Sequence, residues 1–127
     1  MSPGEGRTAV VIEDDPDIRS LICDVLNRSH LRAIGAPNGI EGIAAVRDFD
    51  PVIVTIDLRM PGIDGIEVTK RIREMSSALI VVLSARVTDA YEFESLGAGA
   101  DAYLPKPFRP RELRAQVDAH LRQARRA

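Results

Sequence analysis

Residues 10–19 read VVIEDDPDIR, and this stretch carries three local signals that decide the first half of the fold. Residues 10–12 are apolar and β-branched, which is typical of a strand buried on both faces. Residues 13–15 then place three carboxylates in a row, and two such charges about 4 Å apart repel each other by roughly 4 kcal/mol at an effective dielectric near 20. Asp15 suits a helix N-cap, and Pro16 suits a first helical turn. The stretch therefore predicts a buried strand, an acidic loop and a helix.

The composition is that of one globular domain. The chain has 127 residues, of which 45% are apolar and 28% charged, and its net charge of −2 gives no field that favours nucleic acid or an acidic membrane. Its one cysteine cannot form an internal disulfide, and no apolar run approaches the ~20 residues of a membrane span. The first residues lack the apolar core of a signal peptide. We therefore expect a cytoplasmic protein that makes no membrane contact.

The C-terminal end is basic, with six arginines and two acidic residues in residues 109–127. A solvated helix face that leads into a linker is one interpretation, and a direct contact with nucleic acid is the other. We expect the first, and thus no direct nucleic-acid contact by this domain.

Short apolar runs alternate with helical patterns along the chain. Strands are expected at residues 9–12, 31–36, 52–56, 79–83 and 102–104. The first helical stripe consists of Ile18, Leu21, Ile22, Val25 and Leu26. Further helices are expected at residues 40–48 after Asn38 and Gly39, from Asp64 with Val68, Ile72 and Met75 directed inward, at 88–96 before Gly97 and Gly99, and around Leu113, Val117 and Leu121. This alternation predicts an α/β fold, in which helices cover both faces of a parallel sheet.

Polar side chains stand at the carboxyl ends of the expected strands. Residues 13–15 follow the first strand, Asp57 the third, Ser84 the fourth and Lys106 the fifth. Sites in open parallel sheets form at these ends, so the side chains can converge. Carboxylates without His or Cys suit a hard cation, Mg²⁺ above all, and Lys106 suits an anion beside it. The pattern indicates a site for a phosphoryl group and Mg²⁺, with Asp57 available as a nucleophile.

Each of these residues also has an ordinary structural explanation. An acidic trio before a helix serves as a cap and offsets the helix dipole, and a single aspartate at a strand end is often a turn residue. Ser84 alone carries no signal, and a lysine before a proline is usually solvated. The functional interpretation rests on all four positions occurring together in the expected order.

Four segments resemble the receiver domain of two-component response regulators: VVIEDDPDIR at 10–19, PVIVTIDLRMPGIDGIEV at 51–68, VVLSARV at 81–87 and GAGADAYLPKPF at 97–108. The resemblance covers residues 8–123, which leaves residues 1–7 as an expected disordered segment and 124–127 as the start of a linker or tail. It implies a flavodoxin-like, doubly wound fold of five parallel strands in the order 2-1-3-4-5, flanked by five helices.

The resemblance also implies site roles. Asp57 resembles the phosphorylated aspartate of the family, and Asp14 would bind Mg²⁺ directly, with Mn²⁺ as a substitute ion. Glu13 would act on the metal through water, and the main-chain carbonyl of Arg59 would complete the protein's ligands. Asp15 then falls outside the acidic pair and is expected to be the cap.

Three further positions match the family pattern. Ser84 would donate its hydroxyl to the phosphoryl group, and Lys106 would pair with the same group across a cis bond to Pro107. Tyr103 would be the aromatic switch whose rotamer reports the state of Ser84. In the family, phosphorylation shifts the surface formed by the fourth helix, fifth strand and fifth helix.

The expected role is that of a signalling phosphoacceptor, which promotes its own phosphorylation and dephosphorylation and is not otherwise an enzyme. Its expected partners are a sensor histidine kinase or a histidine phosphotransfer protein in a phosphorelay, and an output domain after residue 127, with transcription regulation as one output. A homodimer on activation is a further expectation. The sequence leaves open the stimulus, the kinase, the output and whether the chain is a fragment.

Some positions depart from the family pattern. Arg59 and Arg86 lie two residues after Asp57 and Ser84, at positions that affect the lifetime of the phosphoryl group, and they either reach it or point to solvent. Glu92, Ala102 and Gln116 replace charged residues that pair the receivers of one subfamily. That dimer is therefore disfavoured, and another dimer or a monomer stays open.

Three other classes of protein share part of this pattern. A haloacid-dehalogenase-type phosphatase needs a second acid where this chain has Arg59, and a flavodoxin-like FMN binder needs phosphate-binding groups where it has Glu13 and Asp14. A pseudo-receiver that acts only by binding partners is the main alternative, although every expected site position is filled.

Overall fold

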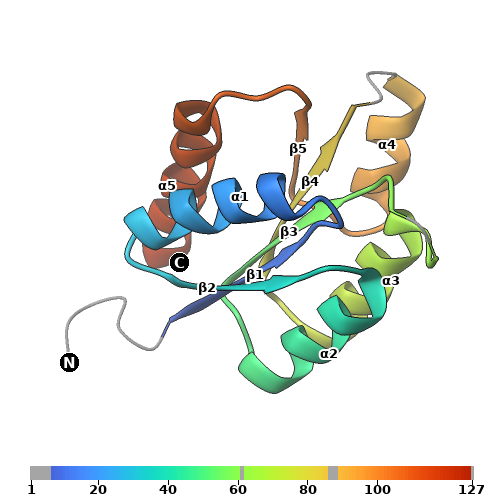
Figure 1. Ribbon diagram of the computed structural model, residues 1–127, viewed down its shortest axis with the longest axis horizontal. Coiled ribbons are helices and arrows are strands. Elements are labelled where there is room, and N and C mark those ends of the chain that lie inside the picture. Colours follow the sequence, from blue (N-terminus) through green and yellow to red (C-terminus); the bar gives the residue numbers. More distant parts are fainter. Residues whose placement is uncertain (1–6, 61, 86–88, 127) are drawn as a thin grey trace.

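The computed structural model describes residues 7–60, 62–85 and 89–126, in which strands and helices alternate (Figure 1). The strands are β1 (Thr8–Ile12), β2 (Arg32–Ala36), β3 (Ile53–Asp57), β4 (Leu79–Ser84) and β5 (Ala102–Pro105). The helices are α1 (Pro16–Arg28), α2 (Gly39–Phe49), α3 (Gly65–Met75), α4 (Asp89–Gly97) and α5 (Pro110–Arg126). The expected strands are all present, with ends that differ by one residue. The expected start of the fourth helix at Thr88 lies outside the described residues.

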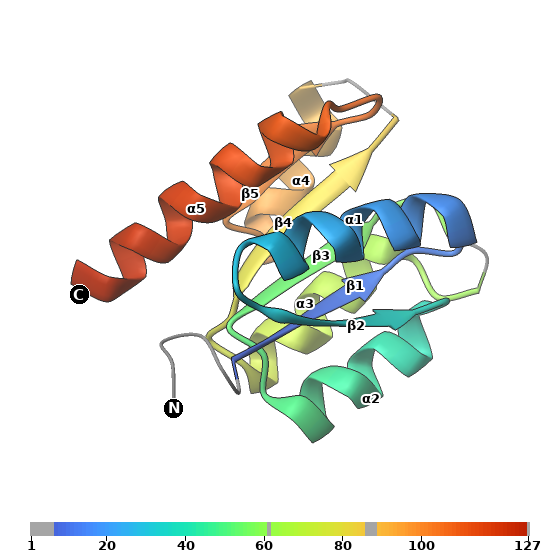
Figure 2. The same cartoon turned by 60° about the vertical axis from the view of Figure 1, so that its left-hand side comes forward.

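The five strands form one parallel sheet in the order β2-β1-β3-β4-β5, which confirms the expected order. Helices α1 and α5 cover one face of the sheet, and α2, α3 and α4 cover the other (Figures 1 and 2). The chain thus forms the expected doubly wound α/β fold. The strand order reverses between β1 and β3, and in sheets of this kind the binding site lies at the carboxyl ends beside that reversal.

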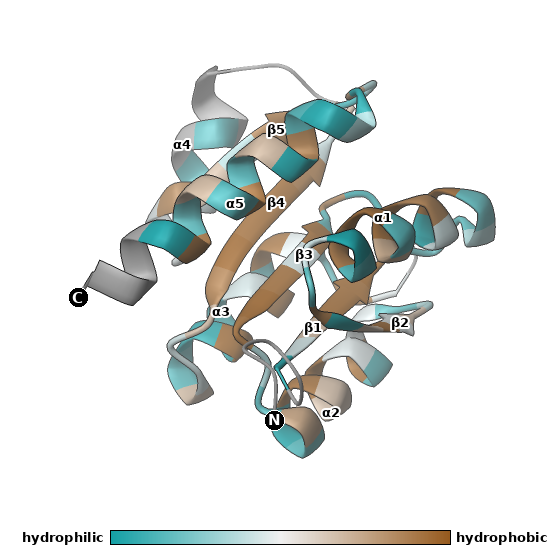
Figure 3. Cartoon of the chain, turned by 90° about the vertical axis from the view of Figure 1, so that its left-hand side faces the viewer, coloured by the Kyte–Doolittle hydropathy of each residue, from teal (hydrophilic) through white to brown (hydrophobic). Residues whose placement is uncertain are grey.

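The continuous apolar runs are explained by burial on both faces. Val10 and Ile12 of β1 pack into the core under α2 and α3, whereas Ala9 and Val11 pack into the core under α1 and α5. All four are at most 1% exposed. Figure 3 shows the central strands as mainly apolar, with α5 presenting polar residues on its outer side. Among the described residues, no helix is both long and apolar enough to cross a bilayer.

Short polar side chains start three of the helices. The carboxylate of Asp15 accepts hydrogen bonds from the backbone N–H groups of Asp17 and Ile18, at 2.9 and 3.1 Å. This confirms Asp15 as the cap of α1. Asn38 and Asp64 cap α2 and α3 in the same manner. Because α1 begins directly after the acidic loop, its cap also helps to define the path of that loop.

Two expected core residues lie at the surface instead. Met75 was expected to face inward but is 43% exposed, because it ends α3 beyond Ile72, the last fully buried position of that helix. Leu21 shares the apolar stripe of α1 but is 40% exposed. It lines an open groove of about 370 Å³ together with Ile18, Ala85, Lys106, Pro107 and Phe108.

Candidate functional site

The four expected strand ends meet at one edge of the sheet. Glu13 follows β1, Asp57 ends β3, Ser84 ends β4, and Lys106 follows β5. Glu13, Asp57 and Ser84 are at most 4% exposed. The expectation that these residues converge is confirmed for the acids and the lysine by the distances that follow.

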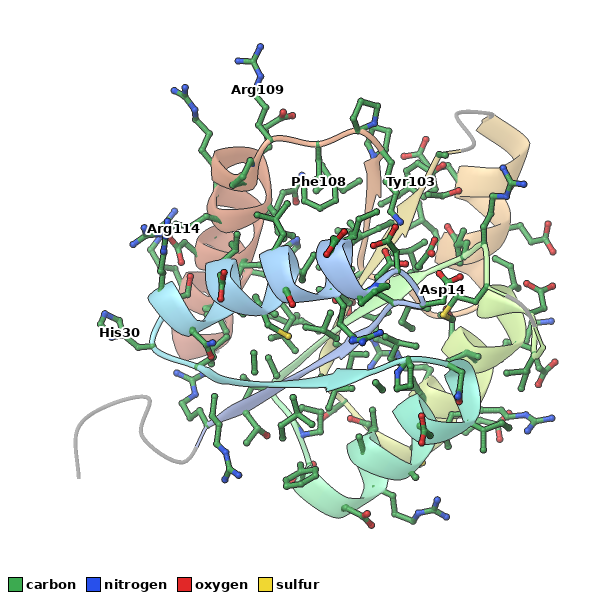
Figure 4. All side chains as sticks on the ribbon, viewed as in Figure 1. Asp14, His30, Tyr103, Phe108, Arg109 and Arg114 are labelled. Atoms are coloured by element: carbon green, nitrogen blue, oxygen red, sulfur yellow. The ribbon has the colours of Figure 1, made fainter. Side chains whose placement is uncertain are left out.

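Three carboxylates form a cluster at this edge. Glu13, Asp14 and Asp57 each offer one oxygen, and these oxygens all lie within 4.8 Å of one another. Glu13 and Asp57 are buried, whereas Asp14 is exposed on the loop after β1 (Figure 4). A group of oxygen ligands with one solvent-exposed member fits a hard divalent cation that keeps part of its water shell.

Lys106 neutralises part of this cluster. Its Nζ lies 2.6 Å from Glu13 Oε1 and 3.5 Å from Asp57 Oδ2, and its side chain is only 16% exposed. The Lys106–Pro107 peptide bond is cis, as expected, and the Lys106 backbone N–H donates to the carbonyl of Ser84 at 2.7 Å. The lysine is therefore fixed to the end of β4 and directed at two buried acids. Sequence reasoning had placed it beside a phosphoryl group and had not anticipated its direct pairing with Glu13.

Burial changes the ionisation of Glu13. Desolvation raises the pKa of its carboxyl from 4.5 to about 7, and the neighbouring Asp57 carboxyl acts in the same direction. Lys106 opposes both effects. The Glu13 carboxyl therefore exchanges its proton near neutral pH, and a bound cation would favour its charged form.

The loop after β3 holds Asp57 in place. The Arg59 backbone N–H donates to Asp57 Oδ1 at 3.1 Å, and the Leu58 N–H donates to the carbonyl of Leu83 at 3.0 Å. A Cβ atom on Gly65 would lie 2.6 Å from Leu58 Cα and 3.0 Å from the Asp57 carbonyl oxygen. Glycine at the start of α3 thus allows this helix to pack directly against the loop. The Arg59 side chain is exposed.

Ser84 and Tyr103, the two expected switch residues, lie on the neighbouring strands β4 and β5. Ser84 is fully buried at the end of β4. Tyr103 on β5 is half-buried and packs against the core under α2, α3 and α4. It lies two strand positions before Pro105, which pairs with Ser84 in the parallel register.

The positions that depart from the family pattern are partly described. Arg86 lies outside the described residues. Glu92 is exposed on α4, and Ala102 and Gln116 are half-buried.

Sequence reasoning missed one further contact of the site. Arg19 on α1 donates from a terminal guanidinium nitrogen to the main-chain carbonyl of Glu13 at 2.9 Å. The sequence contains a signal for it, since Arg19 lies one turn after the cap of α1 and β2 carries a glycine, Gly35, that leaves room for its stem. A charged residue on an otherwise amphipathic helix is usually interpreted as solvated, so the helical pattern alone does not single out Arg19.

The fold and the site together define a doubly wound α/β domain with a buried aspartate, acidic neighbours and a lysine at the strand ends. The model of the response regulator receiver domain family matches residues 9–118. The chain belongs to this family, as its sequence motifs indicated.

Two curated relatives and one solved structure illustrate the similarity. The chain is 39% identical over 115 residues to the transcriptional regulatory protein ResD of Bacillus subtilis, covering 91% of this chain and 48% of ResD. It is 41% identical over 105 residues to a protein-glutamate methylesterase/protein-glutamine glutaminase of Natronomonas pharaonis, covering 80% of this chain and 30% of that protein. The BeF₃-activated N-terminal receiver domain of RstA from Klebsiella pneumoniae matches with a TM-score of 0.84 and 29% identity, covering 91% and 99% of the two chains.

The chain spans about half or less of the length of these curated relatives. The names of the two relatives describe different activities, a transcriptional regulator and an esterase. The similarity therefore establishes the domain family, and it does not assign one output.

Proposed function

We propose that this domain is the phosphoacceptor of a two-component system and that Asp57 receives the phosphoryl group. The observation that carries the proposal is the position of Asp57. This carboxylate is buried at a strand end, 3.5 Å from the Lys106 ammonium, and contributes to an acidic cluster whose oxygens lie within 4.8 Å. The family match supports the same assignment.

The proposed reaction transfers the group between two side chains. A carboxylate oxygen of Asp57 attacks the phosphorus of a phosphohistidine, in line with the phosphorus–nitrogen bond. That bond breaks, its electron pair stays on the donor imidazole, and an acyl phosphate forms on Asp57. Lys106 lies where it can leave Glu13 and offset the added charge of about −1.5 to −2.

The residues present fit a divalent cation. Asp14, Asp57 and the main-chain carbonyl of Arg59 would hold Mg²⁺ or Mn²⁺, and Glu13 would act through a water molecule. When bound, the ion supplies positive charge to the phosphoryl oxygens. The buried, mutually repelling carboxylates of Glu13 and Asp57 support this assignment, because only a cation or a proton relieves their repulsion beyond what Lys106 offers.

The proposed switch follows from the same geometry. Ser84 would turn its hydroxyl toward the new phosphoryl group, and Tyr103 would move into the space that opens. The surface of α4, β5 and α5 would then shift its population of conformers. The domain would thereby promote its own phosphorylation and dephosphorylation and signal through this surface.

The proposed partners follow from this chemistry. A sensor histidine kinase or a histidine phosphotransfer protein would supply the phosphohistidine, and the apolar groove beside Lys106 offers that donor a contact surface. An output segment after residue 127 would receive the signal. The name of ResD supports transcription regulation as that output, and the name of the methylesterase supports an enzyme instead. Such a role would place the domain in the cytoplasm.

The test is intact-mass spectrometry after incubation with Mg²⁺ and a small phosphodonor. The wild-type protein should gain the mass of one phosphoryl group, and Asp57→Asn should gain none. Asp50→Asn, an exposed aspartate after α2, is the matched control and should behave as the wild type does. Equal phosphorylation of the Asp57→Asn variant would refute the site. A wild-type protein that neither gains the group nor binds Mg²⁺ would instead favour a pseudo-receiver.

A further inference from the structure

Arg19 joins three elements around the acidic loop. It extends from α1, and a terminal guanidinium nitrogen donates to the carbonyl oxygen of Glu13 at 2.9 Å. The backbone N–H of Glu13 donates to the carbonyl of Ala36 at the end of β2, at 3.0 Å. The N–H and the carbonyl of Glu13 are therefore both hydrogen-bonded, which fixes the orientation of the Glu13 main chain. Asp14 is the next residue, so its orientation depends on these two hydrogen bonds.

The stem of Arg19 lies across β2. A Cβ atom on Gly35 would come within 3.1 and 3.2 Å of the Arg19 Cδ and Cγ atoms. Gly35 is not among the glycines with a positive φ, so its backbone conformation does not require glycine. The absence of a side chain at this position instead allows the Arg19 stem to approach closely. This contact restricts the directions in which the guanidinium group can point, and it favours the direction of the Glu13 carbonyl.

We propose that Arg19 is a positioning residue that sets the affinity of the acidic cluster for Mg²⁺ by orienting Asp14. The proposal rests on the proposed function, because it assumes that Asp14 and Asp57 bind the ion. Glu13 and Asp57 are buried, so the surrounding side chains restrict their orientation, whereas Asp14 is exposed. The orientation of the Asp14 side chain must therefore be restricted by the main chain beside it. Contacts that orient metal ligands typically change metal affinity by 10- to 100-fold when they are lost.

The direction in which the Mg²⁺ affinity changes when Arg19 is removed distinguishes a positioning role from a purely electrostatic one. A guanidinium group beside the site adds positive charge, which by itself weakens the binding of a cation. Removal of Arg19 would then tighten Mg²⁺ binding if charge were its only influence. Positioning predicts the opposite result, a weaker affinity after the hydrogen bond to the Glu13 carbonyl is lost.

The experiment is a calorimetric titration of Mg²⁺ into metal-free protein, with thermal unfolding of the same samples. Arg19→Met keeps the stem but has no donor, and Arg19→Gln is a second variant without the guanidinium group. We expect about tenfold weaker binding in each, with unfolding still cooperative. Arg19→Lys keeps a donor and should restore part of the affinity. Arg28→Gln is the control, an exposed arginine on the same helix, and should stay within twofold of the wild type.

A result from either Arg19→Met or Arg19→Gln is sufficient, provided that the variant is folded. An affinity within twofold of the wild type, or a tighter one, would overturn the positioning role. Equal weakening in Arg28→Gln would overturn it as well, since the effect would then not depend on the contact with the Glu13 carbonyl. If the wild-type protein itself shows no Mg²⁺ binding, the proposed function fails first and independently of Arg19.

Discussion

The ammonium group of Lys106 donates a hydrogen bond of 2.6 Å to the carboxylate of Glu13, which lies 93 positions earlier in the chain. This contact joins the loop after β5 to the end of β1, across the carboxyl edge of the sheet. Lys106 also lies 3.5 Å from Asp57, so one ammonium group offsets part of the charge of two buried acids. If the proposed divalent cation binds here, it would compete with the lysine for the same two carboxylates.

Removal of Lys106 separates metal binding from phosphoryl transfer. In Lys106→Gln the cluster loses its internal counter-charge, so we expect Mg²⁺ to bind several-fold more tightly. Transfer should slow by about 10²-fold, because one positioned cation is lost from the reacting group. Mg²⁺ titration and the rate of mass gain at saturating Mg²⁺ measure the two effects.

The matched control is Lys70→Gln, which removes the chain's other lysine, an exposed residue on α3. It should leave both values unchanged. Weaker Mg²⁺ binding in Lys106→Gln would show that the lysine organises the cluster more than it competes with the ion.

The pKa of Glu13 makes stability depend on pH. Because this pKa is about 7 in the folded protein and 4.5 in the unfolded chain, the folded state holds more protons between these values. Its free energy of unfolding therefore falls as the pH rises through this window, by roughly 3 kcal/mol from this group. Glu13→Gln should remove this dependence. Urea unfolding of both metal-free proteins at pH 5 and pH 8 measures it.

The comparison between the two proteins isolates Glu13 from other titrating groups. The variant should gain stability relative to the wild type as the pH rises. A difference between the two proteins that is the same at both pH values would contradict the raised pKa.

Gly65 tests whether close packing of α3 maintains the site. In Gly65→Ala the new methyl group meets the backbone of Leu58 at 2.6 Å, which a small side-chain movement cannot relieve. We expect a loss of roughly 1–3 kcal/mol in stability and slower phosphorylation, since the loop directly after Asp57 must shift. At Gly97, by contrast, a Cβ atom meets no atom of the described residues within 4 Å, so Gly97→Ala should leave both unchanged. Similar phosphorylation rates in the two variants would show that the loop adapts.

Thr55 offers a stability test away from the reacting groups. Its hydroxyl oxygen is buried on β3 and has no hydrogen-bond partner in the described part of the chain. Thr55→Val should therefore raise the free energy of unfolding by about 1 kcal/mol. The equally buried Thr69 donates to the Gly65 carbonyl at 2.8 Å, so Thr69→Val should lower it instead. Chemical denaturation that ranks the two variants the other way round would contradict this assignment.

The fold was largely predictable because the three central strands, β1, β3 and β4, are buried on both faces. Residues such as Val10 and Val11 face opposite layers and are both apolar, so the runs in the sequence are continuous and easy to recognise. Alternation then implied a parallel sheet. The strand order came from the family resemblance, because local periodicity carries no information about which strands are neighbours.

The site was predictable as a set of positions but not as a set of contacts. The strand ends placed Asp57 and Lys106 at one edge, since parallel strands share that edge. The pairing of Lys106 with Glu13 depends on side-chain direction, and the contact of Arg19 depends on the space above Gly35. The prediction that Met75 faces inward was wrong for a similar reason, because helical periodicity does not show where a neighbouring layer ends.

The most direct measurement locates the phosphoryl group itself. Borohydride reduces an acyl phosphate to an alcohol, so a phosphorylated aspartate is converted to homoserine, which peptide sequencing by mass spectrometry can identify. After incubation with Mg²⁺ and a phosphodonor, the wild-type protein should yield homoserine at position 57, and omission of the divalent ion should remove it. Homoserine at a different acidic position, or at position 57 to the same extent without a divalent ion, would contradict the account.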